Sequence, residues 1–399
     1  MTNRIVSGMR PTGGLHLGHY HGVLKNWLDL QYRYECFFFV ADWHALTTHY
    51  ADTGMIEASS VDMIVDWLGV GIDPEQSTIF IQSSIPEHAE LFTLLGMITP
   101  LGWLERVPTY KEQQEKLSHL DLNTYGFLGY PLLQAADVLV YHANAVPVGE
   151  DQIPHLEFTR EVARRFNHLY GKDAYDKNKI AQALKYLGDK KAVLFHELRQ
   201  RFQDQGDDEA RKKAKVLLEE VLHLSVGDKE RLLGYLEGTG RKILTEPEVL
   251  LTPASKMPGL DGRKMSKSYH NTIMLREPLE AVAQKIKVMP TDPARKRRTD
   301  PGNPEVCPVF ELHKVYSDHA TQSWVKEGCT TAGIGCLDCK APIIEAICRE
   351  LEPIQEKIAS YKKNPAIVRE ILAHGCDHAR KKARETLREV KEVMGLSIF

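Results

Sequence analysis

An α/β fold is predicted for this chain of 399 residues: a parallel sheet covered by helices, followed by a helical C-terminal region. Short apolar, β-rich stretches alternate with helical patterns as far as residue 171, and this alternation is typical of parallel sheets. Beyond about residue 276 the strand-like stretches stop and helical patterns take over. A glycine-rich turn directly follows the first strand, at the edge where α/β sheets bind ligands.

The individual elements follow from hydrophobic periodicity. Buried strands are predicted at Arg4–Met9, Cys36–Ala41 and Ser77–Gln82, because each is short and mostly apolar. Helices are predicted at Leu15–Leu30 and Ile56–Leu68, where apolar residues recur at helical spacing.

The charged segment 172–242 also has apolar residues at helical spacing, and we interpret it as an inserted helical element. The expected organisation is therefore a domain at 1–275 that contains the insertion 172–242, and a helical domain at 276–399. The formal net charge of −3 gives no sign of a nucleic-acid binder. Two basic runs, Arg295–Arg298 and His378–Lys391, are either local RNA-facing surface or ordinary solvated faces.

No membrane segment is expected. The longest apolar stretch, Cys36–Trp43, is too short to cross a bilayer and contains Asp42. The first residues already enter a strand, so no signal peptide is expected and a cytoplasmic location is predicted.

The first chemical motif is His16-Leu17-Gly18-His19, placed at a predicted helix start after the turn Arg10–Gly14. Unpaired N–H groups and the helix dipole favour an anion there, and His16 and His19 project the same way to donate hydrogen bonds to a phosphate. Gly18 lets an adenine or ribose lie on the backbone. The plainer alternative is two surface histidines on an amphipathic helix.

The second motif is Lys264-Met265-Ser266-Lys267-Ser268, on a loop with Gly259 and Gly262. Ammonium groups on a mobile loop suit the neutralisation of a pyrophosphate during nucleotidyl transfer. A solvated turn is the alternative, which the joint occurrence of both motifs disfavours. Together the motifs predict a nucleoside triphosphate site.

This pair resembles the signature motifs of class I aminoacyl-tRNA synthetases, whose catalytic domain is Rossmann-like. The rest of the chain resembles the bacterial tryptophanyl-tRNA synthetase family over about 1–171 and 244–399. The segments that carry the likeness are Ser7–Gly13, Ala41–Thr47, Gly129–Asp137, Val146–Gln152 and Phe158–Asn167.

The resemblance implies activation of L-tryptophan with ATP and Mg²⁺, then transfer to the 3′ end of tRNA(Trp), by a homodimer with a catalytic domain at 1–275 and an anticodon-binding domain at 276–399. It assigns catalysis to His16, His19, Lys264 and Lys267. It assigns ATP binding to Arg10, Pro11, Thr12, Gly18, His19, Gly149, Glu150, Asp151, Met257, Lys264, Met265, Ser266, Lys267 and Ser268. Asp151 could instead cap the helix that starts near Pro154.

Tryptophan binding is assigned by the resemblance to Gly8, His44, Tyr130, Gln134, Asp137 and Gln152. Gln134 and Asp137 lie three residues apart, on one face of a helix predicted to follow Tyr130-Pro131. A buried carboxylate suits an indole N–H, although it would accept equally well from a tyrosine hydroxyl. Many relatives carry Met where Gln134 stands, which leaves the polarity of the pocket open.

Four of the seven cysteines cluster: Cys307, Cys329, Cys336 and Cys339. In a cytosolic chain such a group favours a metal site over disulfides. Four thiolates fit zinc or an iron–sulfur cluster, or they remain plain thiols. A subset of tryptophanyl enzymes has similar spacing with a 4Fe-4S cluster, so the resemblance favours that cluster, with Zn²⁺ as the alternative.

Two other functions stay open. A nucleotidylyltransferase shares the His-x-Gly-His site but makes a small-molecule adenylate without tRNA. A noncatalytic RNA-binding or redox-sensing paralogue would keep the cysteines and lose the ATP site. The intact motif pair and the helical C-terminal region favour the synthetase.

Overall fold

The computed structural model describes residues 3–107, 122–171, 177–221, 224–238, 242–251 and 257–396. The chain divides into two compact units, each assembled from three segments. The first unit comprises Met1–Ser84, Pro147–Glu150 and Leu250–His378, and the second Ile85–Val146, Asp151–Val249 and Ala379–Phe399. The expected functional division after residue 275 stays a prediction.

A five-stranded sheet has the strand order β3-β2-β1-β4-β5. Its strands are β1 Arg4–Met9, β2 Glu35–Val40, β3 Ser77–Ile81, β4 Ala145–Val148 and β5 Glu248–Leu251. β1 pairs with β2, and β2 with β3, in parallel. The α/β fold class is confirmed, and the three strands predicted from sequence agree with the observed ones to within one residue at either end.

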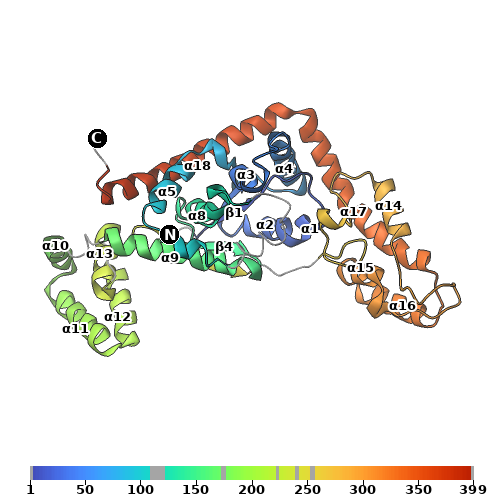
Figure 1. Ribbon diagram of the computed structural model, residues 1–399. Coiled ribbons are helices and arrows are strands. Elements are labelled where there is room, and N and C mark those ends of the chain that lie inside the picture. The colour runs from blue at the N-terminus through green and yellow to red at the C-terminus, as the bar shows by residue number, and fades with distance from the viewer. Residues whose placement is uncertain are drawn as a thin grey trace. The chain divides into compact units, whose positions relative to one another are not determined.

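Both faces of β2 are buried, as expected for a parallel strand. On one face, Trp27 of α2 (Lys25–Leu30) stacks on Phe38 at 4.2 Å between ring centroids and meets Trp67 of α4 (Ile56–Val70) edge-on at 5.1 Å. On the other face, Phe37 stacks on His378 of α18 (Pro365–Val393) at 5.6 Å. Helices therefore cover both faces of this part of the sheet (Figure 1).

The segment predicted as one helix at Leu15–Leu30 is helical from residue 17 but not uniform. It consists of α1 (Leu17–His19), a π-helical turn η1 (Tyr20–Leu24) and α2. The helix after β2 is α3 (Asp42–His49), and a 3₁₀ turn, η2 (Gln82–Ser84), follows β3.

In the second unit, α8 (Tyr125–Leu139) corrects the helix expected to follow Pro131, because Pro131 lies inside it. The helix begins earlier since the hydroxyl of Thr124 caps it by accepting from the N–H of Phe127 at 3.2 Å. The neighbouring helices of this unit are α5 (Glu87–Gly96), α6 (Leu101–Leu104) and α9 (Ile153–Tyr170), which η3 (Glu150–Gln152) precedes.

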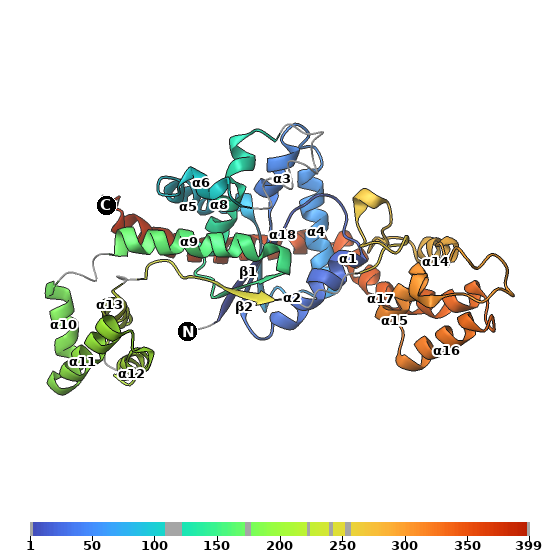
Figure 2. The same cartoon turned by 60° about the horizontal axis from the view of Figure 1, so that its bottom comes forward.

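The inserted element is helical, as predicted. It contains α10 (Lys177–Leu187), α11 (Asp189–Gln205), α12 (Asp208–Glu219) and α13 (Val226–Glu237), which lie next to one another in Figure 2. These helices share a hydrophobic core that includes Phe195, Leu198, Leu218 and Leu232. The parts of the insertion at 172–176, 222–223 and 239–241 lie outside the described residues.

The described residues after 276 contain helices and no strand, as predicted. The helices are α14 (Leu279–Val288), α15 (Pro308–Tyr316), α16 (His319–Thr330), α17 (Cys336–Lys363) and α18, and the 3₁₀ turn η6 (Pro304–Val306) precedes α15. A further 3₁₀ turn, η5 (Lys267–Tyr269), lies before residue 276. α17 packs closely on α4, because Gly69 has no side chain: a Cβ there would lie 2.3 Å from Cγ1 of Ile358. Among the described residues, no helix has the length and apolarity needed to cross a membrane.

Candidate active site

His16 and His19 form a small hydrogen-bonded unit at the start of α1. Nδ1 of His16 accepts from the N–H of Gly18 at 3.1 Å, and Nδ1 of His19 accepts from the N–H of His16 at 3.2 Å. The two rings stand 3.8 Å apart, and a Cβ on Gly18 would lie 2.8 Å from the His16 ring. Because both Nδ1 atoms are acceptors, each neutral ring carries its proton on Nε2.

Both histidines are neutral near pH 7. Burial and the charge of Lys267 lower the pKa of His16 to about 4. Burial, His16, Lys267 and Lys264 together lower the pKa of His19 to about 3. Positive charge at this site is therefore held by the lysines, while the histidines offer neutral N–H donors.

The second motif lies beside the first, as predicted. Nζ of Lys267 donates to the carbonyl oxygen of Thr12 at 2.9 Å, although the two residues are 255 positions apart. Two backbone bonds hold the chain segments together: the N–H of Leu17 donates to Ile273 and that of Leu275 to Leu15. Burial lowers the pKa of Lys267, which shows how far this ammonium is withdrawn from water.

Asn271 organises the lysine loop, and sequence reasoning missed it. Its Oδ1 accepts from the N–H of Ser266 at 2.8 Å, and its Nδ2 donates to Asp261 at 2.7 Å and to the carbonyl of Lys264 at 3.2 Å. A Cβ on Gly259 would lie 2.2 Å from Asn271 Nδ2, so close approach requires glycine there. Only the burial of Asn271, at 2 % exposure, marks it out, and burial is not visible in sequence.

The remaining residues assigned to ATP belong to both units. Arg10 hydrogen-bonds Thr48 through its guanidinium. Pro11 is buried, as are Met257 and Met265, which are joined by a 3.0 Å bond from the N–H of Met265 to the Met257 carbonyl. The hydroxyls of Ser266 and Ser268 lie 2.9 Å apart. Gly149 and Glu150 follow β4 in the first unit, and Asp151 belongs to the second.

Asp151 does not cap α9. The N-cap residue is Gln152, which makes no side-chain cap bond. Instead, Nε2 of Gln152 donates to Oδ2 of Asp151 at 3.0 Å. The alternative helix-cap role is therefore wrong for Asp151, since its carboxylate turns to the side chain of Gln152.

The residues assigned to tryptophan belong to both units. In the first, Gly8 lies at the carboxyl end of β1, where a Cβ would fall 2.4 Å from the ring of Phe39, and His44 is buried in α3. In the second, Gln134 lies half-buried on α8. The hydroxyl of Tyr130 lies 3.0 Å from Nε2 of His155.

Asp137 is 1 % exposed, so its carboxylate is buried and does not lie on the surface of α8. Oδ1 of Asp137 lies 2.6 Å from Nδ1 of His88, and Nε2 of His88 lies 2.7 Å from the hydroxyl of Tyr141. Sequence reasoning missed His88, because no motif or periodicity marks it.

The four clustered cysteines line one small cavity together with Thr291, Asp292, Arg295 and Val309. All seven cysteines are free thiols. Within the described residues, however, no group of three or more histidine, cysteine, aspartate or glutamate side chains is arranged to hold a metal ion. The structure therefore brings the predicted cysteines to one place without forming the predicted ligand geometry.

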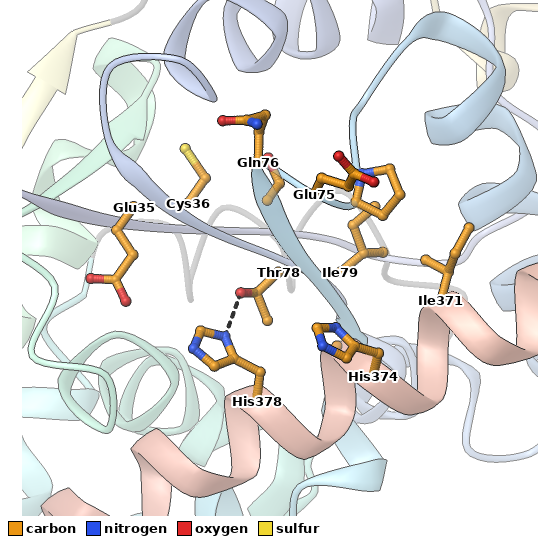
Figure 3. A pocket seen from close by; sticks show the side chains of 12 residues that line it. Glu35, Cys36, Glu75, Gln76, Thr78, Ile79, Ile371, His374 and His378 are labelled. Carbon is orange, nitrogen blue, oxygen red and sulfur yellow. Dashed lines mark hydrogen bonds between the residues drawn. The ribbon is translucent and has the colours of Figure 1, made fainter.

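A larger cavity of about 210 Å³ lies at the opposite edge of the sheet, where β2 and β3 begin. Figure 3 shows Glu35 and Thr78 of the strands on the side of His374 and His378 of α18, with Nδ1 of His378 2.8 Å from the Thr78 hydroxyl, while the Cys36 side chain points away from that helix. None of the predicted site residues lines this cavity.

The family of class I tRNA synthetases for W and Y matches residues 2–221 and 230–352 of the chain. The tryptophan–tRNA ligase of Ralstonia nicotianae is 62% identical over 394 residues, covering 99% of this chain and 98% of the relative. That of Thermotoga maritima is 44% identical, covering 98% of this chain and 99% of the relative.

Among solved structures, the tryptophanyl-tRNA synthetase of Campylobacter jejuni in complex with ADP and tryptophan is similar, with a TM-score of 0.73 and 27% identity. The alignment covers 98% of this chain and 100% of that one. The fold and these matches establish the class: the chain belongs to the class I tRNA synthetases. Within that class, it belongs to the bacterial tryptophanyl-tRNA synthetase family.

Proposed function

We propose that this chain activates L-tryptophan with Mg²⁺-ATP and transfers the tryptophanyl group to the 3′ end of tRNA(Trp). His16, His19, Lys264 and Lys267 contact the reacting phosphates. The observation that carries the proposal is the bond from Lys267 to Thr12, which holds the lysine loop against the His-x-Gly-His turn. The tryptophan carboxylate attacks the α-phosphorus, pyrophosphate leaves, and a ribose hydroxyl of tRNA then displaces AMP from the adenylate.

The histidines and lysines have different tasks in this reaction. Nε2–H of His16 and of His19 donates to phosphate oxygens as their charge develops, and each ring is held by its backbone bond at Nδ1. Lys264 and Lys267 neutralise the triphosphate and then the leaving pyrophosphate. Neutral histidines fit this division, because they add directed donors without repelling the ammonium groups nearby.

The nucleoside of ATP is held by the turn and the lysine loop. Arg10, Pro11 and Thr12 lie on the turn and Gly18 lies in α1, while Met265, Ser266 and Ser268 belong to the lysine loop and Met257 is bonded to it. Gly149, Glu150 and Asp151 are also assigned to ATP. For the amino acid, Asp137 accepts the indole N–H, and Gly8, His44, Tyr130, Gln134 and Gln152 are assigned to tryptophan binding.

The partners are tRNA(Trp), contacted by the anticodon-binding domain at 276–399, and a second copy of the chain, all acting in the cytoplasm. The test of the whole proposal is ATP–pyrophosphate exchange with tryptophan and tyrosine side by side. Exchange that occurs with tryptophan but not with tyrosine supports the proposal. Equal exchange with the two amino acids would contradict the assignment to tryptophan. Charging of purified tRNA separates the synthetase from a nucleotidylyltransferase, and any tryptophan-dependent exchange excludes a noncatalytic paralogue.

A second proposal concerns the cysteines: Cys307, Cys329, Cys336 and Cys339 bind a 4Fe-4S cluster, with Zn²⁺ as the alternative. The donor set fits either group, because four thiols line one cavity. Arg295 Nη1 lies 3.8 Å from Sγ of Cys329, and a Cβ on Gly302 would lie 2.7 Å from the same sulfur. When bound, the group supplies cross-links between α15, α16 and α17 and takes no part in adenylate formation.

A further inference from the structure

Three buried side chains of the second unit form a hydrogen-bonded chain: Asp137 near the end of α8, His88 in the first turn of α5, and Tyr141 just after α8. His88 and Tyr141 are 0 % exposed and Asp137 is 1 % exposed. The rings of His88 and Tyr141 meet edge-on, with centroids 5.3 Å apart. Each side chain is thus fixed by packing as well as by hydrogen bonds.

The direction of the bonds follows from the donors and acceptors present. An ionised carboxylate only accepts, so Nδ1 of His88 carries the proton and donates to Oδ1 of Asp137. In a neutral ring Nε2 is then the acceptor, and the hydroxyl of Tyr141 donates to it. The hydrogen bonds therefore run from Tyr141 through His88 to Asp137, and they orient the Asp137 carboxylate.

Such a bond matters more at Asp137 than elsewhere on α8. The flanking Ala135, Ala136 and Val138 are buried and apolar, and offer no side-chain donor to a carboxylate. An ionised group in such surroundings needs hydrogen bonds to remain charged. A carboxylate accepts up to about four hydrogen bonds, so one carboxylate can hold the His88 donor and a ligand donor together.

We propose that His88, held by Tyr141, is a positioning residue that aims the Asp137 carboxylate at the indole N–H of tryptophan. This inference rests on the proposed function, in which Asp137 accepts that N–H. His88 does not touch the substrate. Its effect is on selection of the indole, because an acceptor that is misaligned or protonated loses its preference for an N–H donor.

The test compares two substrates in ATP–pyrophosphate exchange with the full-length protein. One is tryptophan, and the other is its benzothienyl analogue, in which sulfur replaces the indole N–H. His88→Leu removes the donor to Asp137, and we expect KM for tryptophan to rise about 10–100-fold, the size of a lost hydrogen bond to a charged group. We expect kcat to change less than about threefold, and KM for the analogue to change little.

His88→Asn provides the rescue, because its amide nitrogen takes the place of Nδ1 and can still donate to Asp137. Tyr141→Phe removes one hydroxyl from a buried ring and is the variant least prone to misfold. We expect both to raise KM for tryptophan by about 2–5-fold, with the analogue unaffected. Thermal unfolding of each variant checks that the fold is retained.

Equal losses for tryptophan and the analogue in Tyr141→Phe and His88→Leu would overturn the inference, since they would indicate a purely structural role. An unchanged KM in folded variants would overturn it as well. Failure of the proposed function gives a different result: Asp137→Asn would then leave the preference of the enzyme for tryptophan over the analogue intact.

Discussion

Lys267 donates its ammonium proton to the carbonyl oxygen of Thr12 at 2.9 Å, and this bond joins two motifs that are 255 residues apart. It places a cation beside the turn whose N–H groups and histidines suit an anion. Gly13, next to Thr12, has φ of +95°, and a Cβ there would lie 3.5 Å from Nζ of Lys267. A Cβ at that distance would make only ordinary contact, so it is the left-handed backbone of Gly13 that favours glycine in this turn.

Removing the charge of Lys267 should slow adenylate formation. We expect Lys267→Ala to lower kcat of tryptophan-dependent pyrophosphate exchange by about 10²–10³-fold, typical of losing one donor to developing charge. KM for tryptophan should change much less. Lys381→Ala is the matched control, because Lys381 is an exposed lysine of α18, and it should leave exchange unchanged. A similar loss in both variants would contradict the role given to Lys267.

His19 should act as a neutral donor through Nε2. His19→Gln keeps an N–H near that position and His19→Phe removes it, so we expect losses in kcat of about tenfold and at least a hundredfold, respectively. The pH profile of exchange should show no step near 6.5 from these histidines, because their pKa values are about 4 and 3. A step near 6.5 that disappears in His19→Gln would contradict this prediction.

The same pKa values set a direction for stability. The native state binds fewer protons than the unfolded chain between about pH 4 and 6.5, because burial lowers the pKa of His16 from 6.5 to about 4. The contribution of His16 to the free energy of unfolding is therefore full above pH 6.5 and is lost as the pH falls towards 4. Acid thus destabilises the folded protein through this histidine.

The fold of the first unit was largely predictable. The apolar residues Ile5 and Val6 of β1, Cys36–Val40 of β2, and Ile79 and Phe80 of β3 are buried on both faces of their strands, so these short apolar runs mark the strands in the sequence. The sharing of one triphosphate site by the two motifs was predictable from their chemistry. The particular bond from Lys267 to Thr12 was not, because nothing in the spacing of the two motifs specifies that contact.

What could not be predicted depends on tertiary contacts. His88 acts through Asp137, 49 residues away, whereas Asn271 acts through partners 5 to 10 residues away in its own loop. Neither residue carries a signal in the sequence pattern. The π-helical turn Tyr20–Leu24 does not follow from the helical periodicity of the segment. Its His21 hydrogen-bonds Tyr316 of α15 and Glu350 of α17, contacts that no pattern around the first motif suggests.

Glu350 should stabilise this junction. Burial opposes its ionisation, but hydrogen bonds and charges from His21 and Lys25 outweigh that effect and lower its pKa to about 2. We expect Glu350→Gln to reduce the free energy of unfolding at pH 7 by about 1–3 kcal/mol, measured by urea denaturation. Because the native pKa is below the ordinary value of 4.5, the advantage over the variant should be full above pH 4.5 and fade towards pH 2.

The control for Glu350 is Glu345→Gln, whose side chain is 71 % exposed in its pair with Arg349. We expect a change within about 0.5 kcal/mol there. Equal effects of the two substitutions at pH 7 would refute the view that the buried cluster around Glu350 matters more than a surface pair.

Gly375 allows α18 to lie directly on β3. A Cβ at this position would fall 1.9 Å from the carbonyl oxygen of Ile79, and backbone cannot easily yield. We expect Gly375→Ala to lower the free energy of unfolding by about 1–3 kcal/mol or more. Gly126→Ala is the matched helical control, because a Cβ there meets nothing within 4 Å, and it should be neutral or stabilising by up to about 1 kcal/mol. A neutral Gly375→Ala would show that α18 does not pack on β3 as described.

The cysteine cavity gives the last prediction. Protein purified without oxygen should contain about four iron and four sulfide per chain if a cluster is present, and about one zinc under the alternative. Cys336→Ser should reduce the metal content and lower the melting temperature, because cross-links among three helices are lost. Cys348→Ser is the control: Cys348 does not line the cavity, so this variant should retain the metal.

The metal-depleted protein should lose adenylate formation only in proportion to the fraction of protein that unfolds. A selective loss of kcat at unchanged stability would contradict a structural role. Metal-free protein from anaerobic cells, with unchanged melting in Cys336→Ser, would refute the metal site itself.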